Sequence, residues 1–188
     1  MADNSQHNPL HADFYADRAC QRRVQIVENV RLTDAIYRLR VECPEIAGPI
    51  LPGQFIMLRF SDCNDPLLAR PLALYDTVPG DNGDFTALDI VYLTLGRMTR
   101  RLAEQAAGSE LDIWGPLGNG FPPIPTKHLI MVAGGIGQTP FLALAQEYLG
   151  LRQYGDPPRT APRAEHVTLC YGVRNAALLA GVDDFRAA

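Results

Sequence analysis

A glycine-rich turn at residues 134–140 constrains the fold of this chain more than any other stretch. It reads GGIGQTP, follows an apolar run at 129–133 and leads into an amphipathic segment that continues to residue 149. A strand that breaks on glycines and restarts as a helix suits a nucleotide pyrophosphate, because glycines let the backbone approach the phosphates and the helix N-terminus offers free N–H groups. The pattern predicts a strand over 129–133 and a helix over about 137–149.

The composition is that of a globular protein with a core. Of the 188 residues, 47% are hydrophobic and 20% charged, which suits one domain or two small ones. The net charge of −4 argues against nucleic acid as a partner, since such proteins carry a basic surface. No apolar run reaches membrane-spanning length and the first ten residues are polar, so we expect a cytoplasmic protein without a membrane span.

The cysteines do not indicate a metal site. Cys20, Cys43, Cys63 and Cys170 are far apart in sequence, and no pair has CxxC spacing. In a chain without a visible signal peptide they are expected to be reduced thiols. We therefore predict no metal bound by this chain.

The first two thirds of the chain has the pattern of a small antiparallel barrel. Residues 1–21 lack periodicity and are expected to form a loose tail. Strands are predicted over 24–30, 37–41, 54–60, 72–75, 85–95 and 111–114, and a helix over about 98–106 with Gly108 as its cap. Short strands with one late helix predict an antiparallel β-barrel domain over 22–124.

The last third has the pattern of a parallel α/β domain. Residues 115–125 hold four prolines and three glycines, as an interdomain linker would. The predicted strand at 129–133 and its helix are followed by a strand at 167–171 and a helix from about 175. Two strands cannot form a parallel sheet that is covered on both faces. We therefore expect an incomplete nucleotide-binding domain over 125–188, either truncated or completed by structure from elsewhere.

Individual motifs are ambiguous. Arg70 precedes a strand and could place a bidentate donor fork on a phosphate, although an exposed arginine there is equally ordinary. Thr99 falls in the first turn of a predicted helix, where it could cap the helix or bind an anion. The turn at 134–140 departs from GxGxxG because Pro140 occupies the third glycine position, and no acidic residue closes the strand at 167–171.

Taken in order, these motifs resemble one family. An Arg-Pro strand, a helix with threonine at its start, GPLGNGF at 115–121 and VAGGIGQTP at 132–140 together resemble the ferredoxin–NADP reductase-like superfamily. Within it, the chain is most similar to the electron transfer subunits of NAD-dependent dihydroorotate dehydrogenases. GPLGNGF is the most family-specific string, and YGVRN at 171–175 agrees with it. The resemblance covers about residues 22–185.

The resemblance implies an FAD site in the barrel. Three positions depart from the family pattern: Ala73 replaces a serine that lies near flavin N5, Leu93 replaces a basic residue, and Met98 replaces a glycine. An arginine that holds the FAD phosphates falls on Arg70. The expected FAD-binding residues come from three family segments, namely Arg70, Pro71, Leu72, Ala73, Val91, Tyr92, Leu93, Met98 and Thr99.

The resemblance also implies a nicotinamide-nucleotide site. It falls on Gly134, Gly135, Gly137 and Pro140, with the proline as the family has it, and on Arg174, which could also favour a 2′-phosphate. No catalytic side chain is expected, because a flavin supplies the redox chemistry itself. The family's four cysteine ligands of a 2Fe–2S cluster are absent from this sequence.

The implied activity is electron transfer in pyrimidine biosynthesis. FAD would exchange a hydride with NAD(H) and electrons with an iron–sulfur centre, and the partner would be an FMN-containing catalytic subunit that oxidises dihydroorotate. Two other interpretations stay open. One is a general NAD(P)H-dependent flavin or ferredoxin reductase component of another redox system. The other is a non-catalytic binding module.

Overall fold

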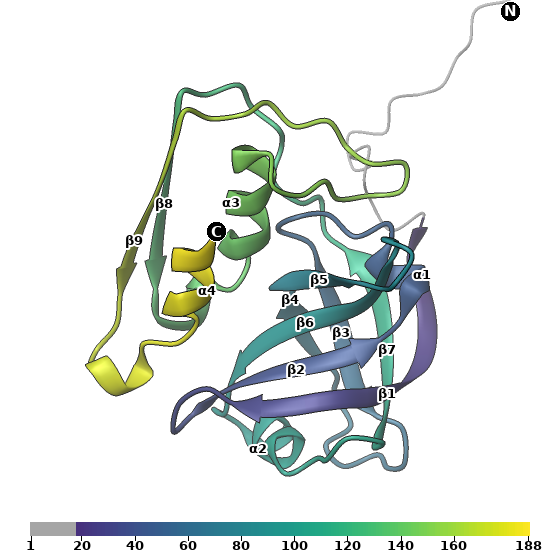
Figure 1. Ribbon diagram of the computed structural model, residues 1–188. Helices are drawn as coiled ribbons and strands as arrows, with labels where there is room; N and C mark the ends of the chain where they lie inside the picture. Colours follow the sequence, from purple (N-terminus) through teal and green to yellow (C-terminus); the bar gives the residue numbers. More distant parts are fainter. Residues whose placement is uncertain (1–17) are drawn as a thin grey trace, which may run out of the picture.

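A computed structural model describes residues 18–188. Its first group of elements is mainly β (Figure 1): β1 (Cys20–Arg31), β2 (Ile36–Glu42), α1 (Pro44–Ala47), β3 (Phe55–Phe60), β4 (Arg70–Ala73), β5 (Asp76–Pro79), β6 (Phe85–Leu93), α2 (Arg97–Ala103) and β7 (Glu110–Leu117). The second group mixes helix and strand: β8 (His128–Gly134), the 3₁₀ turn η2 (Gly135–Gln138), α3 (Phe141–Leu149), β9 (His166–Gly172), the 3₁₀ turn η3 (Ala176–Leu178) and α4 (Val182–Ala187).

The first group forms one curled antiparallel sheet with the strand order β4-β3-β7-β1-β2-β6-β5. Alternation along the strands explains which face of the sheet packs on the core. In β2, Leu39 and Val41 are fully buried, whereas Arg38 and Arg40 alternate with them and stay half-buried. The predicted antiparallel barrel is therefore confirmed with one correction. Within the part of the chain that the structure describes, no ladder of strand pairing joins β4 to β5, so the barrel is open.

Two residues cross the open side of the sheet. The Leu74 N–H donates to the Gln54 carbonyl at 3.0 Å, next to β3, and the Tyr75 N–H donates to the Asp89 carbonyl on β6 at 2.9 Å. Because these neighbouring residues bond to opposite edges, the strand expected over 72–75 ends at Ala73. The crossing also brings the end of β4 to β6.

The second group forms a two-stranded parallel sheet, and the predicted parallel α/β arrangement is confirmed. β8 and β9 pair in register from His128 opposite His166 to Gly134 opposite Gly172. Met131 on β8 packs against Leu144 and Tyr148 of α3. Figure 1 shows α3 between this small sheet and the curled sheet. Within residues 18–188, no helix is both long and apolar enough to cross a membrane.

Several predicted boundaries are wrong. The helix expected from residue 137 begins at Phe141, because Gly135 has a φ of +55° and residues 135–138 form a 3₁₀ turn instead. The helix expected over about 98–106 is α2, which ends at Ala103, so Gly108 is not its cap. In place of one helix from residue 175, the chain has η3 and the short α4. Cys20 and Gln21, placed in the tail, begin β1, while residues 1–17 of that tail lie outside the described residues.

The glycine- and proline-rich segment at 115–125 is only in part a linker. Gly115 and Leu117 belong to β7, where Gly115 pairs with Cys20 of β1 and Leu117 pairs with Phe55 of β3. A Cβ on Gly115 would lie 2.9 Å from Cγ2 of Ile56, so glycine there permits close packing of the strands. The described residues between β7 and β8 form neither helix nor strand. The predicted domain division at 124 and 125 falls in this stretch and stays a prediction.

Gly53 is a position where the fold requires glycine. Its φ is +88°, and an added Cβ would lie 2.6 Å from Cδ2 and 2.9 Å from the backbone N of Phe121. We expect Gly53→Ala to lower the free energy of unfolding by about 2 kcal/mol, from the left-handed backbone and the collision together. Gly83→Ala is the matched control, because Gly83 has a φ of +84° with nothing within 4 Å, and it should cost about 1 kcal/mol. Urea denaturation of both variants measures the difference, and equal losses would contradict the collision.

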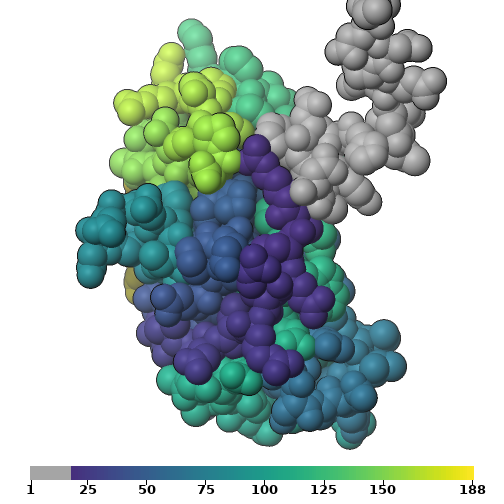
Figure 2. Space-filling model, turned by 90° about the vertical axis from the view of Figure 1, so that its right-hand side faces the viewer, coloured from purple at the N-terminus to yellow at the C-terminus, as the bar shows by residue number. Residues whose placement is uncertain are grey.

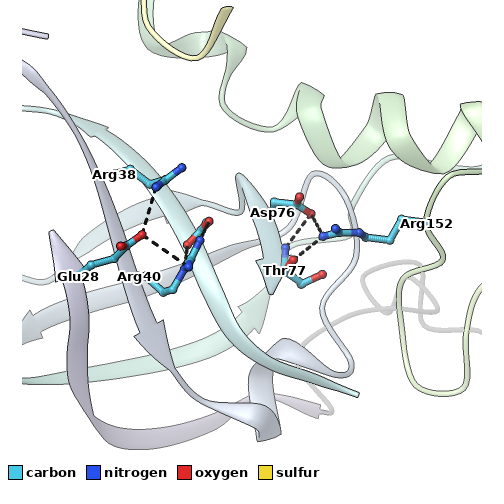
Figure 3. A network of polar contacts seen from close by, with 7 residues as sticks. Glu28, Arg38, Arg40, Asp76, Thr77 and Arg152 are labelled. Atoms are coloured by element: carbon cyan, nitrogen blue, oxygen red, sulfur yellow. Dashed lines mark hydrogen bonds and ion pairs between the residues drawn. The ribbon is translucent and has the colours of Figure 1, made fainter. Parts of the chain in front are cut away.

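One carboxylate connects the two groups of elements. Asp76 on β5 accepts a hydrogen bond from Arg152 Nη1 at 2.7 Å (Figure 3). It also accepts hydrogen bonds from Gln146 Nε2 at 2.9 Å and from the Tyr154 hydroxyl at 2.8 Å. Arg152 also donates to the Thr77 carbonyl. The second group is therefore held against the edge of the curled sheet by charge-assisted hydrogen bonds.

The segment between α3 and β9 completes this contact. Tyr154 is fully buried in the main core, where its ring stacks on Phe85 with centroids 6.1 Å apart. Figure 2 shows the segment, in yellow-green, resting on the blue residues near position 50. Glu147 of α3 and Arg159 form a buried ion pair with a shortest N–O distance of 2.5 Å, and Arg159 Nη1 donates to the Phe121 carbonyl at 2.8 Å.

Candidate functional site

A cavity of about 610 Å³ lies between the curled sheet and the turn that leads into α3. Its volume is typical of sites for small molecules and cofactors. One wall comes from β4, β6 and the start of α2, and the other comes from η2 and the residues just before α3. The lining residues are Arg70, Pro71, Leu72, Ala73, Val91, Tyr92, Leu93, Leu95, Gly96, Met98, Thr99, Ile136, Gly137, Thr139 and Pro140.

Every residue predicted to bind FAD lines this one cavity, together with Gly137 and Pro140 from the predicted nucleotide turn. The crossing at Leu74 and Tyr75 explains why segments 70–73 and 91–93 meet, since it connects the strands that carry them. Gly134, Gly135 and Arg174 lie outside the lining. The binding roles of all these residues stay predictions.

Sequence reasoning missed four lining residues: Leu95, Gly96, Ile136 and Thr139. Each lies within three residues of a predicted position. Their position in sequence next to the predicted motifs is therefore the signal that could have identified them. Leu95 is 76% exposed, so an apolar side chain stands at the edge of the cavity.

Arg70 brings an uncommitted positive charge to the cavity. Its side chain is exposed, and its Nη1 donates only to nearby carbonyls, those of Ala69 at 3.2 Å and Leu68 at 3.4 Å. Among residues 18–188, no carboxylate forms an ion pair with it. A guanidinium in this state can offer a bidentate fork to a phosphate.

Tyr92 has its hydroxyl committed inside the sheet. Burial raises the pKa of this phenol, so it stays protonated, and it donates to Oδ1 of Asn29 at 3.0 Å. Its ring stacks on Tyr37 with centroids 5.8 Å apart. Met98, 1% exposed, belongs to the same core cluster. These two residues contribute structure to the cavity wall, and the Tyr92 hydroxyl is not available to a ligand there.

Thr99 acts as a helix cap, which is one of the two roles that its position allowed. Its hydroxyl oxygen accepts hydrogen bonds from the N–H groups of Leu95 at 3.0 Å and Gly96 at 3.2 Å. These bonds satisfy backbone donors at the start of α2. The hydroxyl is thus engaged within the protein.

The glycines at the carboxyl ends of β8 and β9 leave open space. A Cβ added to Gly134, Gly137 or Gly172 would meet no atom within 4 Å. Gly134 and Gly172 are direct partners across the two strands. Ligands of open α/β sheets bind outside the carboxyl ends of the strands, where such glycines allow the backbone to come close. Arg174 follows two residues after β9 and is exposed.

The cysteines form no disulfide in the described part of the chain. All four are free, and Cys43 is the buried one. Burial raises the pKa of the Cys43 thiol to about 12. Within the described part of the chain, no group of three or more His, Cys, Asp or Glu side chains is placed to hold a metal ion.

The family model for the oxidoreductase FAD-binding domain matches residues 21–121, more than half of the chain. The chain belongs to this family. The matched residues span the curled sheet and include every predicted FAD-binding position.

Curated relatives with the name dihydroorotate dehydrogenase B (NAD(+)), electron transfer subunit, match as well. The protein from Desulforamulus reducens is 35% identical over 117 residues, which are 62% of this chain and 43% of the relative. The protein from Shouchella clausii is 34% identical over 138 residues, covering 72% of this chain and 50% of the relative. The chain therefore spans about half the length of the curated relatives it matches.

Solved structures share the fold. A cytochrome P450 reductase from Amycolatopsis superposes with a TM-score of 0.69 at 22% identity, over 90% of this chain and 48% of that one. An NADH-dependent reduced ferredoxin–NADP oxidoreductase superposes with a TM-score of 0.66 at 23% identity, over 86% and 52%. These similarities establish the ferredoxin–NADP reductase-like arrangement of a curled antiparallel sheet followed by a parallel one.

Proposed function

We propose that this chain binds FAD in the cavity between its two sheets and serves as the flavoprotein electron transfer subunit of a dihydroorotate-oxidising system. The observation that carries the proposal is the convergence of three separate sequence segments, predicted independently of the structure, on one cavity with an unpaired arginine. The family match over residues 21–121 supports the cofactor, and the curated relatives support the system.

The cavity residues fit the parts of FAD. Arg70 would hold the phosphates through charge-assisted hydrogen bonds. Leu72, Val91 and Leu93 offer apolar surface to the ring system, as cofactor pockets commonly do. When bound, FAD supplies the capacity to exchange a hydride with NAD(H) and electrons with another redox centre. The chain's own residues bind and orient it and exclude water from its ring.

The nicotinamide nucleotide would approach from the α/β side. Gly134, Gly135 and Gly137 leave room at the carboxyl ends of the strands, and Gly137 and Pro140 extend this surface to the cavity. Arg174 would lie near the ribose. The electron acceptor would be an FMN-containing catalytic subunit that receives electrons through a 2Fe–2S centre whose ligands are not among the four cysteines of this chain. The cytoplasmic location expected from the sequence belongs to the same proposal.

Reconstitution with FAD tests the proposal. The purified chain is mixed with FAD, desalted, and examined by visible absorption and by release of the flavin on denaturation. We expect a stoichiometric flavin spectrum and its bleaching by NADH. No retained flavin would refute the binding site, whereas retained flavin that neither NADH nor NADPH reduces would favour a binding module. Faster reduction by NADPH would favour a general reductase component.

Ala73→Ser should change flavin reactivity more than flavin retention. Ala73 lines the cavity at the position where the family resemblance places a serine near N5, so the variant adds a hydroxyl at the redox edge without removing a contact. We expect the Kd for FAD to change by no more than about tenfold, since one hydrogen bond contributes about 0.5–1.5 kcal/mol. Stopped-flow reduction by NADH measures the rate. Unchanged kinetics would place Ala73 away from the reactive atom.

A further inference from the structure

Two histidines lie side by side at the amino ends of β8 and β9. His128 begins β8, His166 begins β9, and the two residues are direct partners across the parallel strands (Figure 1). Their imidazole ring centroids are 5.8 Å apart, and both residues are exposed. Within residues 18–188, neither ring forms an ion pair with a carboxylate. The pair therefore presents two imidazoles to solvent at one place on the small sheet.

A hydroxyl on the same face of the sheet orients one of the two rings. Nε2 of His128 lies 2.8 Å from Oγ1 of Thr168, a residue of β9 that alternation places on the same side as His166. When the Nε2–H group donates to this hydroxyl, the lone pair of the imidazole is on Nδ1. Metal-binding histidines usually donate their second ring N–H to an acceptor, because that bond fixes the tautomer and the direction of the ring. His128 is therefore held as a metal ligand would be.

The separation of the rings matches that of two ligands on one ion. Zinc binds imidazole nitrogen at about 2.0–2.1 Å, so two imidazoles on one zinc ion have ring centroids about 5–6 Å apart. The observed 5.8 Å falls in that range. Among residues 18–188, no group of three or more His, Cys, Asp or Glu side chains is placed to hold a metal ion, so water would fill the remaining positions. Imidazole nitrogen suits zinc, nickel and copper, whereas magnesium and calcium prefer oxygen.

We propose that His128 and His166 together bind one divalent transition-metal ion of the zinc type, which joins the amino ends of β8 and β9. The site is separate from the proposed function, because Gly134 and Gly172 at the predicted nucleotide site are the last partners of the same two strands. Within the described residues no third strand pairs with this sheet, so an ion that bridges its strands stabilises it. The inference revises the expectation that this chain binds no metal, since strand pairing joins two histidines that are far apart in sequence.

Calorimetric titration of the full chain with zinc chloride tests the site. We expect one zinc ion per chain, and a Kd that rises by about tenfold or more in His128→Gln and in His166→Gln, since each variant leaves a single imidazole. Thr168→Val should raise the Kd by less, because it removes only the hydrogen bond that orients His128. Thermal unfolding is the second readout. Zinc should raise the Tm of the natural chain and leave the Tm of both histidine variants unchanged.

Two variants control for other zinc ligands. His7→Gln/His11→Gln removes the two remaining histidines of the sequence, which lie outside the described residues. Cys170→Ser removes an exposed thiol of β9 that lies about 13 Å along the strand from His166, out of reach of the pair. The Kd of both variants for zinc should stay within about twofold of that of the natural chain.

An unchanged Kd in His128→Gln and His166→Gln would overturn the inference, and so would a natural chain that takes up no zinc. A rise of about tenfold or more in either control variant would overturn it too, because the ion would then be bound elsewhere. Circular dichroism of each variant separates loss of fold from loss of a ligand. FAD binding by the histidine variants should be unchanged, so a failure of the proposed function is distinguishable from a failure of this inference.

Discussion

Arg159→Leu is expected to lower the free energy of unfolding by about 3–5 kcal/mol. The side chain of Glu147 is 2% exposed and that of Arg159 is 8% exposed, so the leucine leaves a carboxylate buried without its counter-charge. The variant also removes the hydrogen bond to the Phe121 carbonyl. Guanidinium or urea denaturation followed by circular dichroism measures the loss.

The double variant Arg159→Leu/Glu147→Leu is the control for this prediction. Removal of both charges abolishes the buried unpaired carboxylate, so the double variant should be more stable than Arg159→Leu alone. A loss below about 1 kcal/mol in the single variant would show that water reaches Glu147. The exposed pair of Arg31 and Asp34 gives a reference, since Arg31→Leu should change stability by less than about 1 kcal/mol.

Arg70→Ala is expected to weaken FAD binding by about 1.5–3 kcal/mol, which is roughly a 10- to 150-fold rise in the Kd. The guanidinium has no carboxylate partner within the described residues, so its full donor capacity is available to a phosphate. Titration of the apoprotein with FAD, followed by quenching of flavin fluorescence, measures the affinity.

Arg100→Ala and Arg70→Lys are the controls. Arg100 is exposed on α2 and does not line the cavity, so its loss changes the net charge by the same amount without touching the site. Arg70→Lys keeps the charge and loses the planar fork, and its affinity should fall between those of the natural chain and Arg70→Ala. If Arg70→Ala and Arg100→Ala weakened FAD binding equally, Arg70 would contribute only through its net charge and not through a direct contact.

The broad fold could be predicted because its main signals are local. Alternation in 37–41 and the apolar run before GGIGQTP specify strands whose side chains pack as expected. The open barrel and the separate β5 could not be predicted, since they depend on Leu74 and Tyr75 bonding to strands far away in sequence. Gly115 and Leu117 were misassigned because a composition typical of linkers also suits a strand packed closely on Ile56.

The candidate site was predictable as a set of positions and less so as a set of contacts. The resemblance places segments 70–73, 91–93 and 98–99 on one ligand, and the structure brings them to one cavity. Side-chain direction was not predictable. Tyr92 donates to Asn29 inside the core, a partner 63 residues away in sequence.

The carboxylate of Asp76 influences the shape of the cavity although it does not line the cavity. Asp76 stands three residues after Ala73, yet it lines no part of the cavity, and its three side-chain donors all come from the opposite group of elements. Asp76 is therefore one of the contacts that set the spacing between the two cavity walls, beside the hydrogen bond from the Tyr75 hydroxyl to Asp184 and the buried Tyr154. A substitution at Asp76 would therefore alter the width of the cavity without changing any residue that lines it.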